Sequence, residues 1–278
     1  MASLFIPKVY KDAINEKLGV SLKFGLLAND LTDEVSEIKE WGDTVNFPKF
    51  KRVAKVGEIT KGTAVVPSEV DMTENPSPVK HTGGSIRVYD RDAKQIKGKV
   101  QDNMVQQLVD AMDKDLDDAL GAVALSKATK KSKTTSKTEI TSDEIINAFA
   151  LFGDDMDVDT FAGIAINSRL LPSFIKMAEF TSVDKTYQGV ENGIIRNGLV
   201  GYFMGIPVYL TNNNTWVASE CVTYIIKKGA LGYARQKDVS LEIERESKLF
   251  ADDLVVDSLY AVSVTDSDGI VLVRNTVA

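Results

Sequence analysis

A proline-free stretch from Asp92 to Ser126 constrains the fold more than any other part of the chain. Asp92 and Gln95 form a capping-box-like pair at its start, so the sequence predicts one helix of about 35 residues, roughly 50 Å long. Its apolar residues recur at every fourth position, as Ile96, Val100, Met104, Leu108, Met112, Leu116, Leu120 and Ala124. Each step of four advances this stripe by about 40° around the helix axis. We therefore expect a spine helix that presents different faces to different partners along its length, with neighbouring molecules among them.

Residues 43–90 predict a long two-stranded hairpin. A strand-like run extends from Asp43 to Lys55, and an alternating run from Ser85 to Tyr89 ends the segment. Between the two runs, glycine, proline, lysine and threonine are frequent and large apolar residues are few. A structureless loop of this length is uncommon in a compact domain, and an isolated hairpin is marginally stable in water. We therefore expect the hairpin to leave the body and to pack on another molecule.

The remaining segments predict a mixed α+β chain. A lysine-rich stretch over residues 127–141 is expected to be a solvated loop. Ser142 is expected to cap a helix that ends at Phe152, and Ser168 is expected to begin a helix that ends near Phe180. Strands are expected at residues 161–166, 202–210, 221–226, 239–243, 254–264 and 270–273, with a hairpin turn at residues 268–269.

The composition argues against several classes of function. The single histidine, His81, and the single cysteine, Cys221, rule out two-histidine metal sites, cysteine–histidine zinc sites and an intrachain disulfide. A formal net charge of −7 disfavours sequence-specific binding of nucleic acid. The sequence has no secretory signal and no apolar run of about 18 residues, so we expect no membrane span.

Fragments that resemble catalytic or metal-binding motifs fail in detail. Asp113, Asp115 and Asp117 have the spacing that begins a calcium loop, but the required glycine and glutamate do not follow, and residues 155–159 fail likewise. We expect both groups of aspartates to be solvated acidic surfaces. Gly57 and Gly62 have phosphate-loop spacing without the lysine that such loops need.

No catalytic residue, cofactor or metal ligand is expected in this chain. His81 is followed by Thr82-Gly83-Gly84 and is interpreted as an exposed histidine in a turn. No serine has the flanking glycines of a nucleophile elbow. A pair of carboxylates for acid–base chemistry stays open, because 40 acidic residues make chance pairs inevitable.

Three stretches carry a resemblance to a known family. They are the run 86–92 that leads into the long helix, the run 201–213 with Gly205-Ile206-Pro207-Val208, and the acidic strand 239–246 followed by Phe250-Ala251-Asp252-Asp253 and a tyrosine-bearing strand. With the order of the parts, they resemble the major capsid proteins of tailed bacteriophages, which have the Hong Kong 97 (HK97) type fold. The resemblance covers most of the chain.

The resemblance implies a division into four parts. Residues 1–42 would be an N-terminal arm and residues 43–90 an extended hairpin loop. Residues 91–141 and 236–278 would form a peripheral domain around the spine helix, and residues 142–235 an α/β axial domain.

The resemblance also implies a structural function and no enzymatic activity. The chain would be a coat protein that self-assembles into the pentamers and hexamers of an icosahedral shell around viral double-stranded DNA, without binding DNA sequence-specifically. It would be assembled in the cytoplasm of a bacterial host and would remain in the virion. Scaffolding, portal and decoration proteins are candidate partners, and no membrane is involved. We expect the interface between subunits to include Lys49, Lys51, Arg52, Lys55, Glu58, Lys61, Arg87 and Arg91.

Three alternatives stay open at this point. An encapsulin-type compartment shares the fold and would hold cargo protein in place of DNA. A phage tail or connector protein would form tubes or rings. An unrecognised α+β hydrolase would be a small oligomer that depends on one carboxylate.

Overall fold

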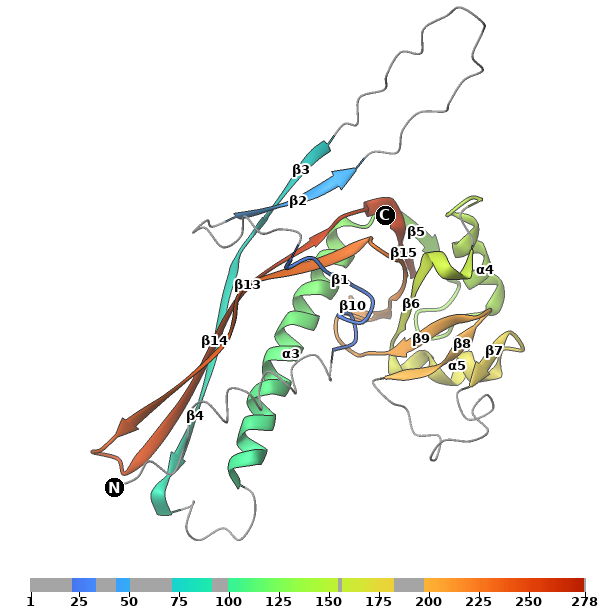
Figure 1. Ribbon diagram of the computed structural model, residues 1–278. Coiled ribbons are helices and arrows are strands. Elements are labelled where there is room, and N and C mark those ends of the chain that lie inside the picture. The colour runs from blue at the N-terminus through green and yellow to red at the C-terminus, as the bar shows by residue number, and fades with distance from the viewer. Residues whose placement is uncertain are drawn as a thin grey trace, which may run out of the picture.

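A computed structural model describes residues 22–33, 44–50, 72–91, 100–154, 157–182 and 198–277. In these residues the chain forms two large β-sheets that share one long helix, α3, at Val100–Lys127, and two further sheets of two strands each (Figure 1). We call the four-stranded sheet with the order β1-β13-β14-β4 the long sheet. We call the seven-stranded sheet with the order β5-β15-β12-β6-β9-β8-β7 the broad sheet. The predicted α+β class is confirmed.

The long sheet is built on a ribbon of two long antiparallel strands, β13 at Leu231–Glu246 and β14 at Ala251–Val264. β4, at Lys80–Tyr89, pairs with β14 along its whole length, and the short β1, at Asn29–Asp30, runs parallel to β13. His81 and the two glycines at 83 and 84 therefore lie in a strand. The prediction that His81 lies in a turn is wrong, because β14 supplies the pairing that the local sequence does not reveal.

Helix α3 packs on both sheets. Leu108 and Val109 lie in a core with residues of the long sheet, including Leu241 and Leu254. Farther along the helix, Leu120 and Ala124 lie in a second core that includes residues of the broad sheet. The winding stripe thus passes from one sheet to the other. The helix does present different faces to different partners. From residue 104 onward these partners are the two sheets of the same chain, so this part of the stripe does not require a neighbouring molecule. Residues 92–99 lie outside the described residues.

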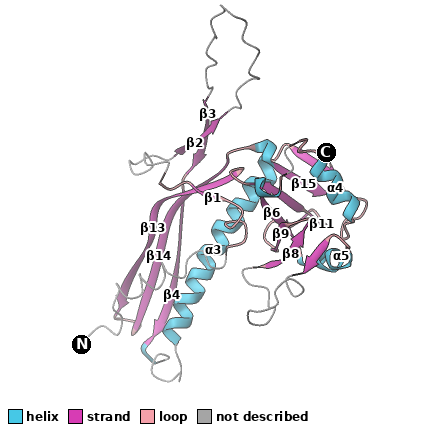
Figure 2. Ribbon diagram, turned by 45° about the vertical axis from the view of Figure 1, so that its right-hand side comes forward, coloured by secondary structure: helices cyan, strands magenta, loops and turns pink. Residues whose placement is uncertain are grey.

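The broad sheet has two helices on the side away from α3, namely α4 at Ser142–Ala150 and α5 at Leu171–Lys176 (Figure 2). Its strands are β5 Lys130–Lys133, β6 Phe161–Ile166, β7 Phe180–Ser182, β8 Leu199–Phe203, β9 Ile206–Leu210, β12 Thr223–Lys227 and β15 Ile270–Arg274. The core under these helices is aromatic: Phe149 meets Phe161 edge to face with ring centroids 5.2 Å apart, and Phe174 meets Phe203 at 6.3 Å. Such edge-to-face pairs add to the stabilisation from apolar burial.

The broad sheet corrects several predictions. Lys130–Lys133 is not a solvated loop but an edge strand parallel to β15. The strand tolerates its lysines because Lys131 and Lys133 are exposed and Lys130 is only half-buried. The expected strand 202–210 is two strands, β8 and β9, because Met204 and Gly205 have positive φ values of 49° and 87° and form a two-residue turn. The helix expected to end near Phe180 stops at Lys176, where Met177 becomes extended.

The connection from β14 to β15 links the two sheets. The predicted hairpin turn at residues 268–269 is wrong, since Ser267–Gly269 is one turn of 3₁₀ helix and the strands before and after it belong to different sheets. A small further hairpin, β10 at Trp216–Val217 and β11 at Glu220–Cys221, precedes β12.

Candidate assembly surfaces

Strands β2, Thr44–Phe50, and β3, Met72–Pro78, pair antiparallel and form the root of a hairpin. The prediction that the run Ser85–Tyr89 ends this hairpin is wrong, because that run lies in β4 and pairs with β14 of the long sheet. Val45 and Phe47 are buried against Ala234 and Ala261 of the ribbon. The amide of Asn75 donates to Ser263 Oγ and to the carbonyl of Val264, each at 2.8 Å. The root is therefore fixed to its own chain, and β2 and β3 extend away from the two sheets (Figures 1 and 2).

The structure describes only some of the predicted interface residues. Lys51, Arg52, Lys55, Glu58 and Lys61 lie outside the described residues, and for Lys49 only the backbone, in β2, is described. Arg91 follows β4 and is exposed. Arg87 lies on β4 opposite Asp253 of β14, and its guanidinium donates to both carboxylate oxygens at 2.7 and 2.6 Å. Arg87 therefore has a partner inside its own chain, which sequence reasoning did not foresee.

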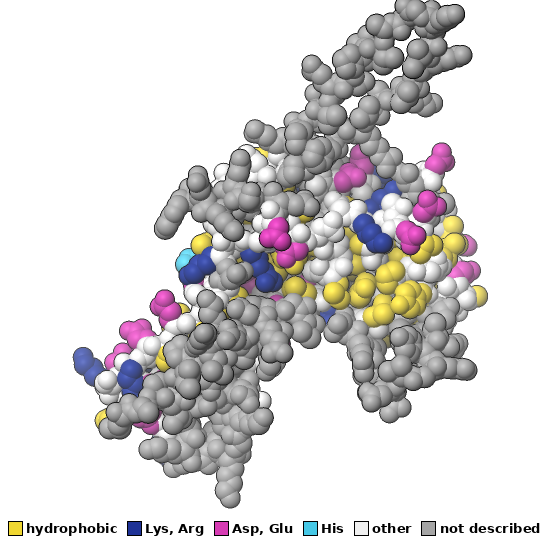
Figure 3. Space-filling model, viewed as in Figure 1, with side chains coloured by type: hydrophobic (Ala, Val, Ile, Leu, Met, Phe, Trp, Pro, Cys, Tyr) yellow, Lys and Arg dark blue, Asp and Glu magenta, His cyan; other side chains and the backbone are white. Residues whose placement is uncertain are grey.

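A second arginine clamps the end of the long sheet. The Arg245 guanidinium donates to the two oxygens of Asp90 at 2.7 and 2.6 Å and to Asp252 at 2.9 Å. Hydrogen bonds to these carboxylates raise the pKa of Arg245, so it stays charged. On the face of Figure 3, charged side chains of both signs are interspersed at this end of the molecule. A mixed, paired surface of this kind favours specific over purely electrostatic contacts.

A third ionic group lies farther along the same ribbon. Lys237 Nζ is 2.7 Å from Asp257 Oδ2, Ser240 donates to the other oxygen, and His81 Nε2 is 3.2 Å from Oδ2. The hydrogen bonds from Lys237 and Ser240 lower the pKa of Asp257 to about 2. This cluster joins all three long strands of the sheet, so its evident effect is structural.

Residues 22–33 dock across the junction of α3 with both sheets. Leu22, Phe24 and Leu27 are buried in the core of α3 and the broad sheet, and Phe24 meets Tyr224 edge to face with centroids 5.1 Å apart. Leu31 N donates to the carbonyl of Tyr233 at 2.9 Å. A Cβ at Gly163 would lie 2.9 Å from the carbonyl oxygen of Pro207 and 2.8 Å from the Leu27 side chain, so the close backbone approach favours glycine.

The carboxylate of Asp117 anchors this segment. One oxygen accepts from the amides of Lys23 at 3.0 Å and Gly25 at 3.1 Å, and the other accepts from the side chain of Asn213 at 3.3 Å. Burial raises the pKa of Asp117 above its ordinary value, although these hydrogen bonds oppose the shift. Asp113 is buried as well, and Asp115 accepts from the Tyr260 hydroxyl at 2.5 Å. The prediction of a solvated acidic surface is wrong for Asp113 and Asp117, whereas Asp115 is exposed, as are Asp157 and Asp159 of the second predicted group.

Metal-binding and nucleophilic groups are scarce among the described residues. No group of three or more histidine, cysteine, aspartate or glutamate side chains within them could hold a metal ion. Burial raises the pKa of the Cys221 thiol, which makes it a poor nucleophile. None of the helices in these ranges has the length and apolarity needed to cross a bilayer.

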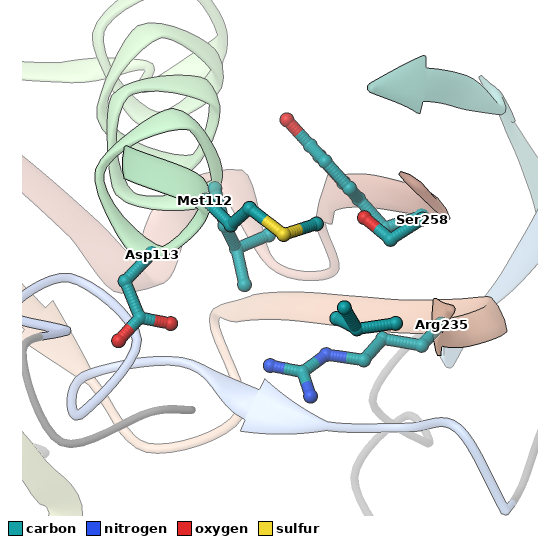
Figure 4. Close-up of a pocket in the computed structure, with 7 residues that line it drawn as sticks. Met112, Asp113, Arg235 and Ser258 are labelled. Atoms are coloured by element: carbon teal, nitrogen blue, oxygen red, sulfur yellow. The ribbon is translucent and has the colours of Figure 1, made fainter. Parts of the chain in front are cut away.

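A small cavity lies between α3 and the long sheet (Figure 4). Its volume of about 20 Å³ leaves room for roughly one water molecule. Arg235 extends from the ribbon toward the helix, and Asp113 and Met112 border the cavity from α3 (Figure 4). A cavity of this size can hold a water molecule that hydrates a buried polar group, but it cannot hold a substrate.

Comparison with known proteins assigns the fold. No protein-family model matches the sequence, and no curated protein matches it. A solved chain of Mycobacterium phage Che8 matches with a TM-score of 0.65 at 18% identity, covering 92% of each chain. The capsid of the cyanophage P-SCSP1u matches with a TM-score of 0.61 at 12% identity, covering 86% of this chain and 85% of that one. This chain has the phage capsid fold.

A third match extends the likeness beyond phage particles. The capsid of an empty GTA particle matches with a TM-score of 0.64 at 12% identity, covering 94% of this chain and 91% of that one. The Hong Kong 97 type fold expected from the three sequence stretches is thereby confirmed. At such low identity the likeness concerns the fold, and the function is argued separately below.

Proposed function

We propose that this chain is the major capsid protein of a tailed phage or of a GTA particle, and that it acts by self-assembly and has no enzymatic activity. The observation that carries the proposal is the fold match over more than nine tenths of this chain and of a chain from the capsid of an empty GTA particle. The described root of the hairpin supports it: β2 and β3 are fixed to the ribbon and extend away from the two large sheets, and a hairpin that leaves its domain is marginally stable unless it packs on another molecule.

The finer proposal concerns the particle. Subunits would form pentamers and hexamers through heterologous contacts that close into rings, and these would enclose double-stranded DNA. The net charge of −7 suits an interior that does not bind DNA tightly during packaging and release. The same proposal places the protein in the virion and leaves scaffolding, portal and decoration proteins as further partners.

The residues of the proposed interface differ in how well their substitution would test it. Lys49, Lys51, Arg52 and Lys55 would give the hairpin a basic surface for acidic patches on a neighbour, and Glu58 and Lys61 belong to the same proposed interface. Arg87 is a poor probe of that contact, since its reversal to glutamate would break the internal pair with Asp253. Reversal of Lys51 and Lys55 to glutamate is the better test, read as loss of particles with unchanged thermal unfolding of the free subunit.

Electron microscopy of the purified full chain tests the main proposal. Closed shells of uniform diameter, and nuclease-protected DNA in particles from producing cells, are the expected result. Shells that hold protein cargo would indicate an encapsulin-type compartment, and tubes or open rings would indicate a tail or connector protein. A chain that stays monomeric at every concentration and ionic strength would overturn the proposal.

A further inference from the structure

Strand β5 forms one border of the broad sheet and has a free edge. It pairs in parallel with β15, and among the described residues no strand pairs with its other side (Figure 1). An edge of this kind presents main-chain donors and acceptors to any further strand that fits beside it. The side chains of β5 therefore decide which strand that is.

The pairing with β15 shows which main-chain groups of β5 are available. The amide of Thr134 donates to the carbonyl of Arg274 at 3.0 Å, and Ser132 lies opposite Val273. Successive residues of a strand direct their main-chain groups to alternate sides, so Ser132 and Thr134 face β15. The amides and carbonyls of Lys131 and Lys133 consequently face away from the sheet. Within the described ranges no hydrogen bond occupies these four groups.

The side chains of the same two lysines make this edge basic. Lys131 and Lys133 are exposed and lie on one face of the strand, roughly 7 Å apart along it. Neither has an ion-pair partner in the described part of the chain. Lys130 lies on the opposite face, where its Nζ is 5.3 Å from the centre of the Phe152 ring. The free edge thus combines two open main-chain sites with two uncompensated cations.

These charges discriminate among the possible partners. Two copies that met edge to edge through β5 would place lysines opposite lysines, so a second β5 is a poor partner. A strand with aspartate or glutamate at alternate positions would place its carboxylates beside Lys131 and Lys133 and would fill the main-chain sites as well. A nucleic acid matches the charges only, and β5 has no aromatic side chain on which a base could stack.

We propose that the free edge of β5 binds an extended acidic segment of another protein, which joins the broad sheet as a further strand with alternate carboxylates beside Lys131 and Lys133. In this mode of recognition the main-chain hydrogen bonds supply affinity and the side chains supply selectivity. The inference goes beyond the proposed function, because it concerns a second kind of protein and does not depend on shell formation.

Synthetic peptides test the proposal on the purified full chain. The probe is a fluorescent ten-residue peptide in which glutamate alternates with threonine, and its binding is followed by fluorescence anisotropy. Saturable binding that weakens as salt is added is the expected result. A peptide with lysine in place of glutamate should not bind. A peptide with the same glutamates and N-methyl groups on all internal amides keeps the charge but cannot pair as a strand, so it should bind at least about tenfold more weakly.

Variants of β5 place the binding at this edge. The double variant Lys131→Glu, Lys133→Glu should weaken binding of the probe by about tenfold or more. The matched control is Lys114→Glu, Lys176→Glu, which makes the same change of charge at two exposed lysines of α3 and α5. It should bind the probe like wild type.

A second pair of variants separates the main chain from the charge. Lys131→Gln removes the cation, whereas Lys131→Pro also removes an amide that faces away from the sheet, a position where an edge strand tolerates proline. Binding should therefore be weaker for Lys131→Pro than for Lys131→Gln. Urea unfolding of both variants checks that the sheet is intact.

Three results would overturn the proposal. They are absence of binding by the probe, equal binding of the N-methylated peptide, and unchanged binding by the double glutamate variant. An oligothymidylate that displaces the probe and binds more tightly would also overturn it and would identify a nucleic-acid site. None of these results bears on whether the chain forms shells, so the proposed function stands or falls separately.

Discussion

Glu220 is a carboxylate with no exposed surface, and it fastens the residues that follow β15. It accepts from Arg274 Nε at 2.6 Å and from the amide of Thr276 at 2.8 Å. Burial by itself would raise the pKa of Glu220, but the hydrogen bonds from Thr276 and Arg274 outweigh it and hold the pKa below the ordinary value. The folded chain therefore stabilises the ionised form of Glu220.

The depressed pKa of Glu220 predicts a loss of stability in acid. A carboxyl with a lowered folded pKa contributes stability that is complete above its unfolded pKa of about 4.3 and is lost as the pH falls through the folded pKa. We expect Glu220→Gln to reduce the free energy of unfolding at neutral pH by about 1–3 kcal/mol. The difference from wild type should shrink on acidification, as measured by urea unfolding of the unassembled chain from about pH 7 to pH 3. A difference that stays constant with pH would contradict the assignment.

Asp117 makes a prediction about residues 22–33. The substitution Asp117→Ala leaves the amides of Lys23 and Gly25 without their acceptor, which costs about 1–3 kcal/mol for a fully buried group and less for these half-buried residues. Hydrogen exchange at these two amides should accelerate strongly, and urea unfolding should shift to lower concentration. Asp110→Ala is the control on the same helix, because Asp110 is exposed and accepts only from Gln106 nearby. Equal exchange in both variants would show that Asp117 does not hold the segment.

These aspartates also show where residue-level reading of the sequence fails. The sequence marks Asp113 and Asp117 as charged, and charged residues are usually solvated. Their partners lie far away in the chain, at Lys23, Gly25 and Asn213 for Asp117. One signal was present, since both aspartates directly follow members of the apolar stripe, Met112 and Leu116, and so border the buried face.

At the scale of elements, helix α3 connects two cores, so substitutions of its leucines can be distinguished by the core that each one disturbs. Leu108→Ala should open a cavity under the long sheet, and Leu120→Ala should open one in the core shared with the broad sheet. Each should cost about 2–5 kcal/mol. Hydrogen exchange should rise mainly in β4 for the first variant and mainly in β12 for the second. Gln107→Ala, at an exposed position of the same helix, is the control, and identical exchange maps for the two leucine variants would contradict the two-core arrangement.

The sequence reveals elements best where their own pattern is long. The spine helix and the alternating strand at residues 239–243 follow from periodicity alone. β5 does not, because Lys130–Lys133 becomes a strand only through pairing with β15, far along the chain. The break between β8 and β9 was hidden as well, since Met204 takes a left-handed conformation that its residue type does not suggest.

At the scale of the whole molecule, the described root of the hairpin allows folding of the subunit to be tested separately from the proposed assembly. Replacing residues 51–71 by a short glycine-rich turn leaves β2, β3 and their contacts with the ribbon in place. We expect the free energy of unfolding of the subunit to change by less than about 1 kcal/mol, because loop length costs little. Electron microscopy should show no closed shells. Normal shells from this variant would show that the hairpin is dispensable for assembly.

The candidate surfaces could be predicted only in part. The resemblance identified the capsid fold and drew attention to the hairpin lysines, most of which lie outside the described residues. It did not single out Leu249 and Phe250, which are 47% and 69% exposed in the turn between β13 and β14, because their exposure depends on the register of these two strands and on the ion pairs of Arg245. Nor could it show that Arg87 is occupied by Asp253, a cross-strand neighbour that is distant in the chain.

The pairing of β4 with β14 has a consequence for synthesis in the cell. Ile86 lies opposite Leu254, so the long sheet stays incomplete until about 170 further residues have been made, which takes roughly 10–35 s at ordinary translation rates. β15, which lies between β5 and β12, arrives later still. A nascent chain therefore cannot present a finished long sheet or hairpin root. In the proposed assembly, only released subunits would be competent to join a shell.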